Sequence, residues 1–130
     1  MRPLSILVLL QATLLAPAPA APAPMRLVLF GAVWCAPCRA ELRNLPALAG
    51  AAAPQRITLA WIDRPALPTT AEVAQLPPAQ AARLARELLG EGYGLPAAVM
   101  LDAGGRACAV LRAPLTPAAI AGLRKACTAG

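Results

Sequence analysis

Continuous apolar runs along the chain predict four buried strands. The runs cover residues 26–32, 57–62, 97–101 and 106–112. Short runs of this kind are typical of strands that are covered on both faces. Residues 102–105 (Asp-Ala-Gly-Gly) separate the last two runs, and their glycines tolerate the positive φ of a tight turn. We therefore expect the last two strands to form a hairpin.

Apolar residues at helical spacing predict three helices. The first starts at Ala36, and we expect Pro46 to kink or interrupt it. Its inward face carries Leu42, Leu45 and Leu48, which leaves Glu41 outside that face. The second covers residues 79–89, with an inward face of Ala82, Leu84, Ala85, Leu88 and Leu89. The third follows the N-cap Thr116 and turns inward Ile120, Leu123 and Cys127.

The order of these elements predicts an α/β fold. The order is β-α-β-α-β-β-α, and a helix between the first two strands implies a parallel pair with a right-handed crossover. The hairpin adds two antiparallel strands. We expect a mixed four-stranded sheet with helices on both faces, in one domain of residues 26–130. Residues 64–78 are rich in Pro and Thr and predict a loop with one helical turn near Glu72.

The N-terminal residues have the pattern of a secretory signal. Arg2 precedes an apolar stretch over residues 4–15, and Ala-Pro-Ala at 18–20 is a cleavage site. The stretch is shorter than the ~20 residues that span a bilayer, which disfavours the alternative of an uncleaved anchor. We expect residues 1–20 to be a signal peptide and residues 21–25 an Ala/Pro-rich spacer, so that the domain is periplasmic or secreted.

The charge of the chain does not indicate a nucleic-acid partner. Twelve Lys and Arg residues against six Asp and Glu give a formal net charge of +6. The basic residues are scattered, and no basic stripe is interleaved with aromatic residues. The chain has no His, which excludes His-based metal sites and His general bases. The four cysteines remain as the candidate chemistry.

Cys35 and Cys38 form a C-x-x-C pair where the first strand passes into the first helix. Half a zinc site has the same spacing, but the chain has neither a second close pair nor a His, so we expect no metal. At a helix N-terminus, free N–H groups and the helix dipole stabilise a thiolate. We predict that Cys35 attacks disulfides and that Cys38 resolves the mixed disulfide. Trp34 offers an apolar surface to a polypeptide substrate; half-buried packing is the alternative.

Residues 34–41, W-C-A-P-C-R-A-E, resemble the active-site run of the thioredoxin superfamily. They are similar to the TlpA-like branch of exported thiol–disulfide oxidoreductases, which includes the thioredoxin-like proteins of cytochrome c maturation. The resemblance covers about residues 26–125 and implies a thioredoxin-like fold. It also implies that Glu41 handles protons for the cysteines; an ordinary exposed carboxylate is the alternative.

Residues 93–96 and 99–106 resemble the segment that carries the superfamily's cis-proline. The resemblance implies that Pro96 is that cis-proline, beside the cysteines, and that the backbone of Leu95 pairs with substrate. The chain departs from the pattern at Leu29, where many thioredoxins have a buried Asp, and at Leu95, where the branch commonly has Thr or Val. Residues 64–78 are too short for the strand and helix that the branch often inserts.

The other two cysteines predict a structural disulfide. Cys108 lies near the start of the last strand, and Cys127 lies near the end of the last helix. The rises of a strand and a helix bring both residues to the same end of the domain. An exported compartment favours oxidation. Two buried free thiols are the alternative.

Together these features predict an exported thiol–disulfide oxidoreductase without a cofactor, acting as a monomer on protein thiols and disulfides. Ala-Pro between the cysteines lacks the His of strongly oxidising relatives, so we expect a reductant of envelope proteins. Apocytochrome c is one candidate substrate, and a membrane-bound protein is one candidate electron donor. The alternative is a non-catalytic binding or assembly module with a structural Cys35–Cys38 bond. Peroxide reduction normally requires a Thr and an Arg around a single cysteine, a pattern that we do not find.

Overall fold

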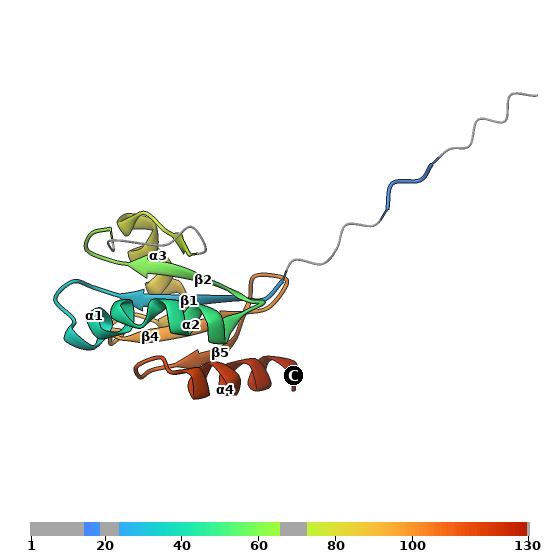
Figure 1. Cartoon of the computed structure of the whole chain (residues 1–130). Coiled ribbons are helices and arrows are strands. Elements are labelled where there is room, and N and C mark those ends of the chain that lie inside the picture. Colours follow the sequence, from blue (N-terminus) through green and yellow to red (C-terminus); the bar gives the residue numbers. More distant parts are fainter. Residues whose placement is uncertain (1–14, 19–23, 66–72, 130) are drawn as a thin grey trace, which may run out of the picture.

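Figure 1 shows the chain as a computed structural model, which describes residues 15–18, 24–65 and 73–129. Most of the predicted signal peptide and spacer, and the helical turn predicted near Glu72, lie outside these residues. No helix within the described ranges is long and apolar enough to cross a membrane.

Five strands and four helices form in the described residues. The strands are β1 (Arg26–Gly31), β2 (Arg56–Trp61), β3 (Ala74–Gln75), β4 (Ala97–Leu101) and β5 (Ala107–Leu111). The helices are α1 (Ala36–Arg43), α2 (Leu45–Ala52), α3 (Pro78–Leu89) and α4 (Pro117–Thr128). The sheet has the order β3-β2-β1-β4-β5, so that β1 lies at its centre. As predicted, β1 is parallel to β2, and β4 and β5 are antiparallel.

The prediction of four strands was wrong by one, because β3 lies in the segment predicted as a loop. Thr58 of β2 pairs with Ala74, and Leu59 pairs with Gln75, both in parallel. A strand of two residues has no apolar run of its own, since it is defined by backbone pairing with its neighbour. The other four strands follow the predicted runs to within one residue at each end.

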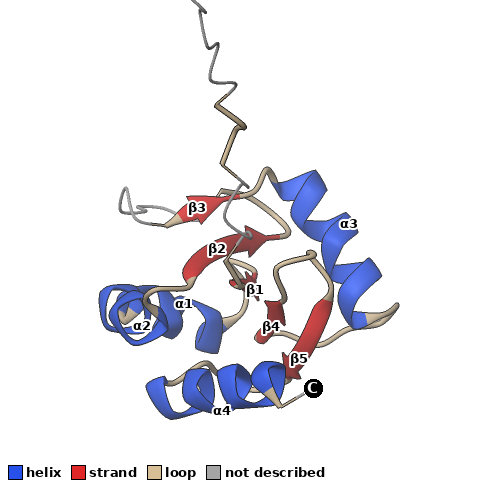
Figure 2. Cartoon of the chain, turned by 90° about the vertical axis from the view of Figure 1, so that its right-hand side faces the viewer, coloured by secondary structure: helices blue, strands red, loops and turns tan. Residues whose placement is uncertain are grey.

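Helices cover the sheet on both faces, as predicted. In Figure 2, α3 lies on one side of the sheet and α1, α2 and α4 lie on the other. The side chains of β1 alternate between these layers: Leu27 and Leu29 belong to the cluster under α1, α2 and α4, whereas Val28 and Phe30 face α3. Burial on both faces explains why β1 is a continuous apolar run rather than an alternating one.

The helix predicted from Ala36 is divided at Asn44 into α1 and α2. Pro46 lies in the first turn of α2, where its missing N–H and fixed φ are tolerated. The break therefore falls before the proline rather than at it.

The inward face predicted for the second helix is partly wrong. In α3 the buried residues are Ala81, Ala85 and Leu89. Leu84 and Leu88 are partly buried and pack against the same cluster, as predicted, whereas Ala82 is partly buried and does not belong to it. Residues four positions apart lie on one line of a helix. The line that faces the sheet carries two alanines, and their small side chains let α3 lie close to the strands.

Arg124 of α4 stabilises the C-terminal end of α2. Its Nη2 donates to the carbonyl oxygen of Ala52 at 2.9 Å, and its Nε donates to Oε1 of Gln55 at 2.8 Å. The last carbonyls of a helix lack partners within the helix, and a cation there also complements the helix dipole. This one side chain joins α2 and α4 over the sheet.

A disulfide joins Cys108 of β5 to Cys127 of α4, with their Cα atoms 5.0 Å apart. Leu101 of β4 pairs with Arg26 of β1 on one side and with Ala107 of β5 on the other. The first residues of β1 and β5 therefore lie at the same end of the sheet. The bond therefore lies at the opposite end of the sheet from Cys35, which follows the end of β1.

Removing this disulfide should destabilise the domain without unfolding it. The bond closes a loop of 19 residues. A loop of that length restricts the unfolded chain by about 3 kcal/mol. We expect the free energy of unfolding of Cys108→Ala/Cys127→Ala to be lower by roughly that amount. Urea unfolding followed by far-UV circular dichroism measures it, and an unchanged midpoint would show that the bond contributes nothing.

Candidate active site

The end of β1 has no space for a side chain. A Cβ atom on Gly31 would lie 2.9 Å from Nε1 of Trp61 and 3.1 Å from Cβ of Cys38. Without that atom, Cys38 packs against the end of the strand, and the buried Trp61 ring lies beside both. The chain then turns into α1, and the N–H of Cys35 donates to the carbonyl of Ala32 at 3.1 Å.

Cys35 is the N-cap of α1 and is joined to Cys38 by a disulfide, with the Cα atoms 5.2 Å apart. The sulfur of Cys35 accepts a hydrogen bond from the backbone N–H of Cys38 at 3.2 Å. In the reduced pair, the same N–H and the helix dipole would stabilise a thiolate on Cys35. Cys35 is thus the cysteine whose sulfur lies at the positive end of the helix.

Two side chains that the sequence analysis did not assign to the site hold the turn before the cysteines. The N–H of Val33 donates to Oδ2 of Asp63 at 2.9 Å, and the carbonyl of Val33 accepts from Nη1 of Arg39. Asp63 follows β2, the parallel neighbour of β1. The carboxyl ends of parallel strands lie at the same end of a sheet. The position of Asp63 directly after β2 could therefore have predicted that it lies near the turn that follows β1.

Trp34 projects into solvent next to the disulfide. Its side chain is 66% exposed, among the few large apolar side chains outside the core in the described ranges. The alternative of half-buried packing does not fit this exposure. An exposed aromatic ring next to the cysteines forms an apolar surface that a polypeptide can contact.

Glu41 is buried, contrary to the expectation that it lies outside the inward face of its helix. It is 4% exposed, and its Oε2 accepts a hydrogen bond from the N–H of Leu115 at 2.8 Å. Its Oε1 has no hydrogen-bond partner in the described part of the chain. Burial raises the pKa of Glu41 from 4.5 to about 7, against the smaller, opposite effect of the Leu115 N–H. The helical spacing of apolar residues did not predict the burial of Glu41, because a charged residue does not count in that pattern.

Pro96 lies beside the cysteine loop. The Leu95–Pro96 peptide bond is cis. Pro96 and Pro37, which stands between the two cysteines, line one open hollow of about 260 Å³. We call this hollow the proline groove; its other lining residues are Gly94, Leu95, Arg112, Ala113 and Pro114. The groove joins the loop before β4 to the loop between β5 and α4.

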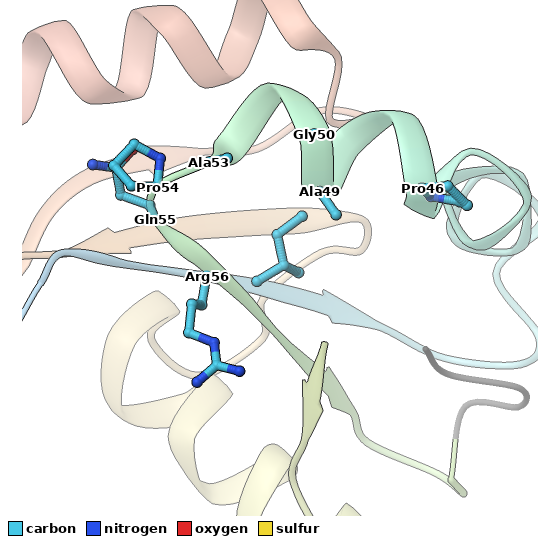
Figure 3. A pocket seen from close by; sticks show the side chains of 8 residues that line it. Pro46, Ala49, Gly50, Ala53, Pro54, Gln55 and Arg56 are labelled. Atoms are coloured by element: carbon cyan, nitrogen blue, oxygen red, sulfur yellow. The ribbon is translucent and has the colours of Figure 1, made fainter. Parts of the chain in front are cut away.

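A second hollow, of about 470 Å³, lies between α2 and the start of β2, at the opposite end of β2 from Trp61 (Figure 3). Arg56 is the one charged residue of its lining, and its side chain turns away from α2. Without a nucleophile or a second ionisable group, this hollow offers no redox chemistry. In the described residues, no group of three or more His, Cys, Asp or Glu residues comes together.

Neither a protein-family model nor a curated protein sequence matches the chain, but solved structures do. StoA from Bacillus subtilis superposes with a TM-score of 0.59 at 14% identity, over 80% of this chain and 84% of that one. A thioredoxin-related protein from Neisseria meningitidis serogroup B gives 0.58 at 17% identity, over 83% and 87%. A DsbF homologue from Corynebacterium diphtheriae gives 0.58 at 17%, over 78% and 71%. The chain has the thioredoxin fold.

Within this thioredoxin fold, the predicted site residues come from two separate parts of the chain. One part, between the end of β1 and the last turn of α1, holds Trp34, Cys35, Cys38 and Glu41. Leu95 and Pro96 lie before β4, and the proline groove connects them to Pro37. Cys108 and Cys127 lie at the other end of the sheet and take no part in the site. Leu29, at the position of the buried Asp of many thioredoxins, packs in the core.

The raised pKa of Glu41 predicts a pH dependence of stability. Between pH 4.5 and about 7 the folded protein keeps a proton that the unfolded chain has lost, so the free energy of unfolding falls as the pH rises. The fall is up to about 3 kcal/mol. Glu41→Gln cannot titrate and lacks this contribution.

Urea unfolding of the oxidised proteins at pH 4.5, 5.5, 6.5 and 7.5 measures this effect, because Cys35 and Cys38 do not titrate as a disulfide. We expect wild type to lose stability relative to Glu41→Gln across this range. A difference that stays constant with pH would contradict a proton held by Glu41 in the folded state.

Proposed function

We propose that this protein is an exported thiol–disulfide oxidoreductase that reduces disulfides of other proteins through Cys35 and Cys38. The observation that carries the proposal is the Cys35–Cys38 disulfide at the N-terminus of α1, where the Cys35 sulfur accepts a hydrogen bond from the Cys38 N–H. The thioredoxin fold, the exposed Trp34 and the proline groove support it. A purely structural bond would need neither an exposed aromatic ring nor an open groove beside it.

The proposed reaction transfers two electrons in two exchange steps. The Cys35 thiolate attacks one sulfur of the substrate disulfide, forms a mixed disulfide and releases the other substrate sulfur as a thiolate, which takes up a proton. The Cys38 thiolate then attacks the Cys35 sulfur, which restores the Cys35–Cys38 bond and releases the second substrate thiol. A thiol donor, for which a membrane-bound protein is a candidate, returns the pair to its dithiol form.

Glu41 is the proposed proton acceptor for Cys38. The two residues lie three positions apart on α1, so their side chains share one side of the helix, and both are buried. A carboxylate with a pKa of about 7 can accept a proton near neutral pH and give it back in the reverse step. With Leu29 in the core, Glu41 is the buried carboxylate in the described residues.

Export is supported by two features of the chain. Residues 1–20 have the pattern of a signal peptide. The Cys108–Cys127 disulfide suits an oxidising compartment, where a structural bond persists while the Cys35–Cys38 pair is turned over. We propose a periplasmic or secreted monomer that acts on envelope proteins, with the cysteines of apocytochrome c as a candidate substrate.

Insulin reduction in the presence of dithiothreitol tests the activity. Wild type should accelerate the precipitation of the insulin B chain, whereas Cys35→Ser should fall to the uncatalysed rate because it lacks the nucleophile. Cys108→Ala/Cys127→Ala, which loses a disulfide but keeps the redox pair, is the matched control and should stay active. Equal rates for wild type and Cys35→Ser would instead favour a binding module with a structural Cys35–Cys38 bond.

The reduction potential tests the direction. No basic side chain stands between the cysteines to stabilise the thiolate, and an ionised Glu41 would disfavour it. A less stable thiolate favours the disulfide form, so the pair should be reducing. Equilibration with glutathione should give a value nearer to about −270 mV than to about −120 mV. A value near the latter would overturn the reductant assignment.

A further inference from the structure

The proline groove has one charged residue in its wall. The other lining residues, among them Pro37, Leu95 and Pro96, have uncharged side chains. Arg112 comes directly after β5 and lines the same hollow. A polypeptide whose cysteine reaches Cys35 beside Pro37 and Pro96 would therefore have neighbouring residues within reach of this guanidinium.

The guanidinium of Arg112 is held in place but not neutralised. Its Nη2 donates to the carbonyl of Leu89, at the C-terminal end of α3, at 3.0 Å. That bond uses one of the five N–H groups of the side chain. In the part of the chain that the structure describes, the ion pairs of α3 are Arg83–Glu87 and Arg86–Glu91, and no carboxylate pairs with Arg112.

We propose that Arg112 is a specificity-determining residue, which binds the carboxylate of an Asp or Glu next to the cysteine of the substrate. The inference rests on the proposed reductase function and narrows its substrates to disulfides with acidic neighbours. A planar guanidinium with free N–H groups matches a carboxylate, with which it forms two parallel hydrogen bonds. The Leu89 carbonyl fixes the side chain before the substrate arrives, which lowers the entropy cost of binding.

Arg112 also has a plain structural role, as a cation at the C-terminal end of α3. That role predicts the same effect of Arg112 substitutions on every substrate. The proposed role predicts an effect that depends on the charge of the substrate. The two are separated by changing the substrate and the protein together.

The experiment uses disulfide-linked dimers of the capped peptide Ala-X-Cys-X-Ala, with X as Glu, Gln or Lys. The reduced full-length protein is mixed with each dimer, and its oxidation is followed by tryptophan fluorescence. We expect the second-order rate constant of wild type to be about 5-fold higher for the Glu dimer than for the Gln dimer, and lowest for Lys. The preference should shrink in 1 M NaCl, because salt screens exposed charges.

Variants assign the preference to Arg112. Arg112→Gln should react equally fast with the Glu and Gln dimers, whereas Arg112→Lys should keep a reduced preference for Glu. Arg83→Gln is the matched control. It also removes one positive charge, but from α3 and outside the groove, so it should keep the wild-type ratio of the Glu to the Gln rate constant. A Glu-to-Gln ratio that is the same in wild type and Arg112→Gln would overturn the proposal.

Bis(2-hydroxyethyl) disulfide, which is small and neutral, separates this proposal from the proposed function. Wild type should reduce it, because the exchange needs Cys35 and Cys38 but no charged neighbour. Reduction of this disulfide without any Glu preference in wild type would leave the oxidoreductase standing and end the role of Arg112. Failure of wild type to reduce it, or any of the peptides, would end both.

Discussion

The close packing at Gly31 is the constraint on which the site depends. Because the end of β1 carries no side chain, Cys38 and Trp61 pack directly against the strand. That packing fixes where α1 starts and leaves Cys35 as its N-cap. The stabilisation of a thiolate by the helix then follows from backbone geometry alone, since the N–H of Cys38 points at the Cys35 sulfur. Asp63 and Arg39 hold Val33 from both sides and complete the turn.

Glu41 connects this site to the rest of the molecule. Its hydrogen bond to Leu115 joins α1 to the loop between β5 and α4, across 74 positions of the chain. The same loop contains Arg112 and Pro114, which line the proline groove. The Glu41 carboxylate therefore holds the loop that forms one side of the groove. Its burial raises its pKa and destabilises its charged form, which is a cost that an ordinary surface carboxylate would not have.

The two disulfides lie at opposite ends of the central strand. Cys35 and Cys38 follow the end of the central strand, next to an exposed ring and an open groove. Cys108 and Cys127 lie where that strand begins and join the edge strand β5 to α4. Arg124 adds a second link from α4, to the end of α2. Both links of α4, to β5 and to the end of α2, therefore lie at the end of the sheet away from Cys35 and Cys38.

The sequence predicts most of the fold, because apolar runs and helical spacing depend on neighbours in the chain. It predicts the order of the long strands and helices, the hairpin, the C-x-x-C pair at a strand-to-helix junction and both cysteine pairings. It does not predict the short strand β3, since that strand exists only through pairing with β2. Three features were decided by tertiary structure alone. They are the burial of Glu41, the hydrogen bond from Val33 to Asp63, and the place of Arg112 in the proline groove. Each joins residues at least 30 positions apart or lines a hollow made by the start of α1 and two separate loops. Polar side chains carry no periodic signal of such contacts.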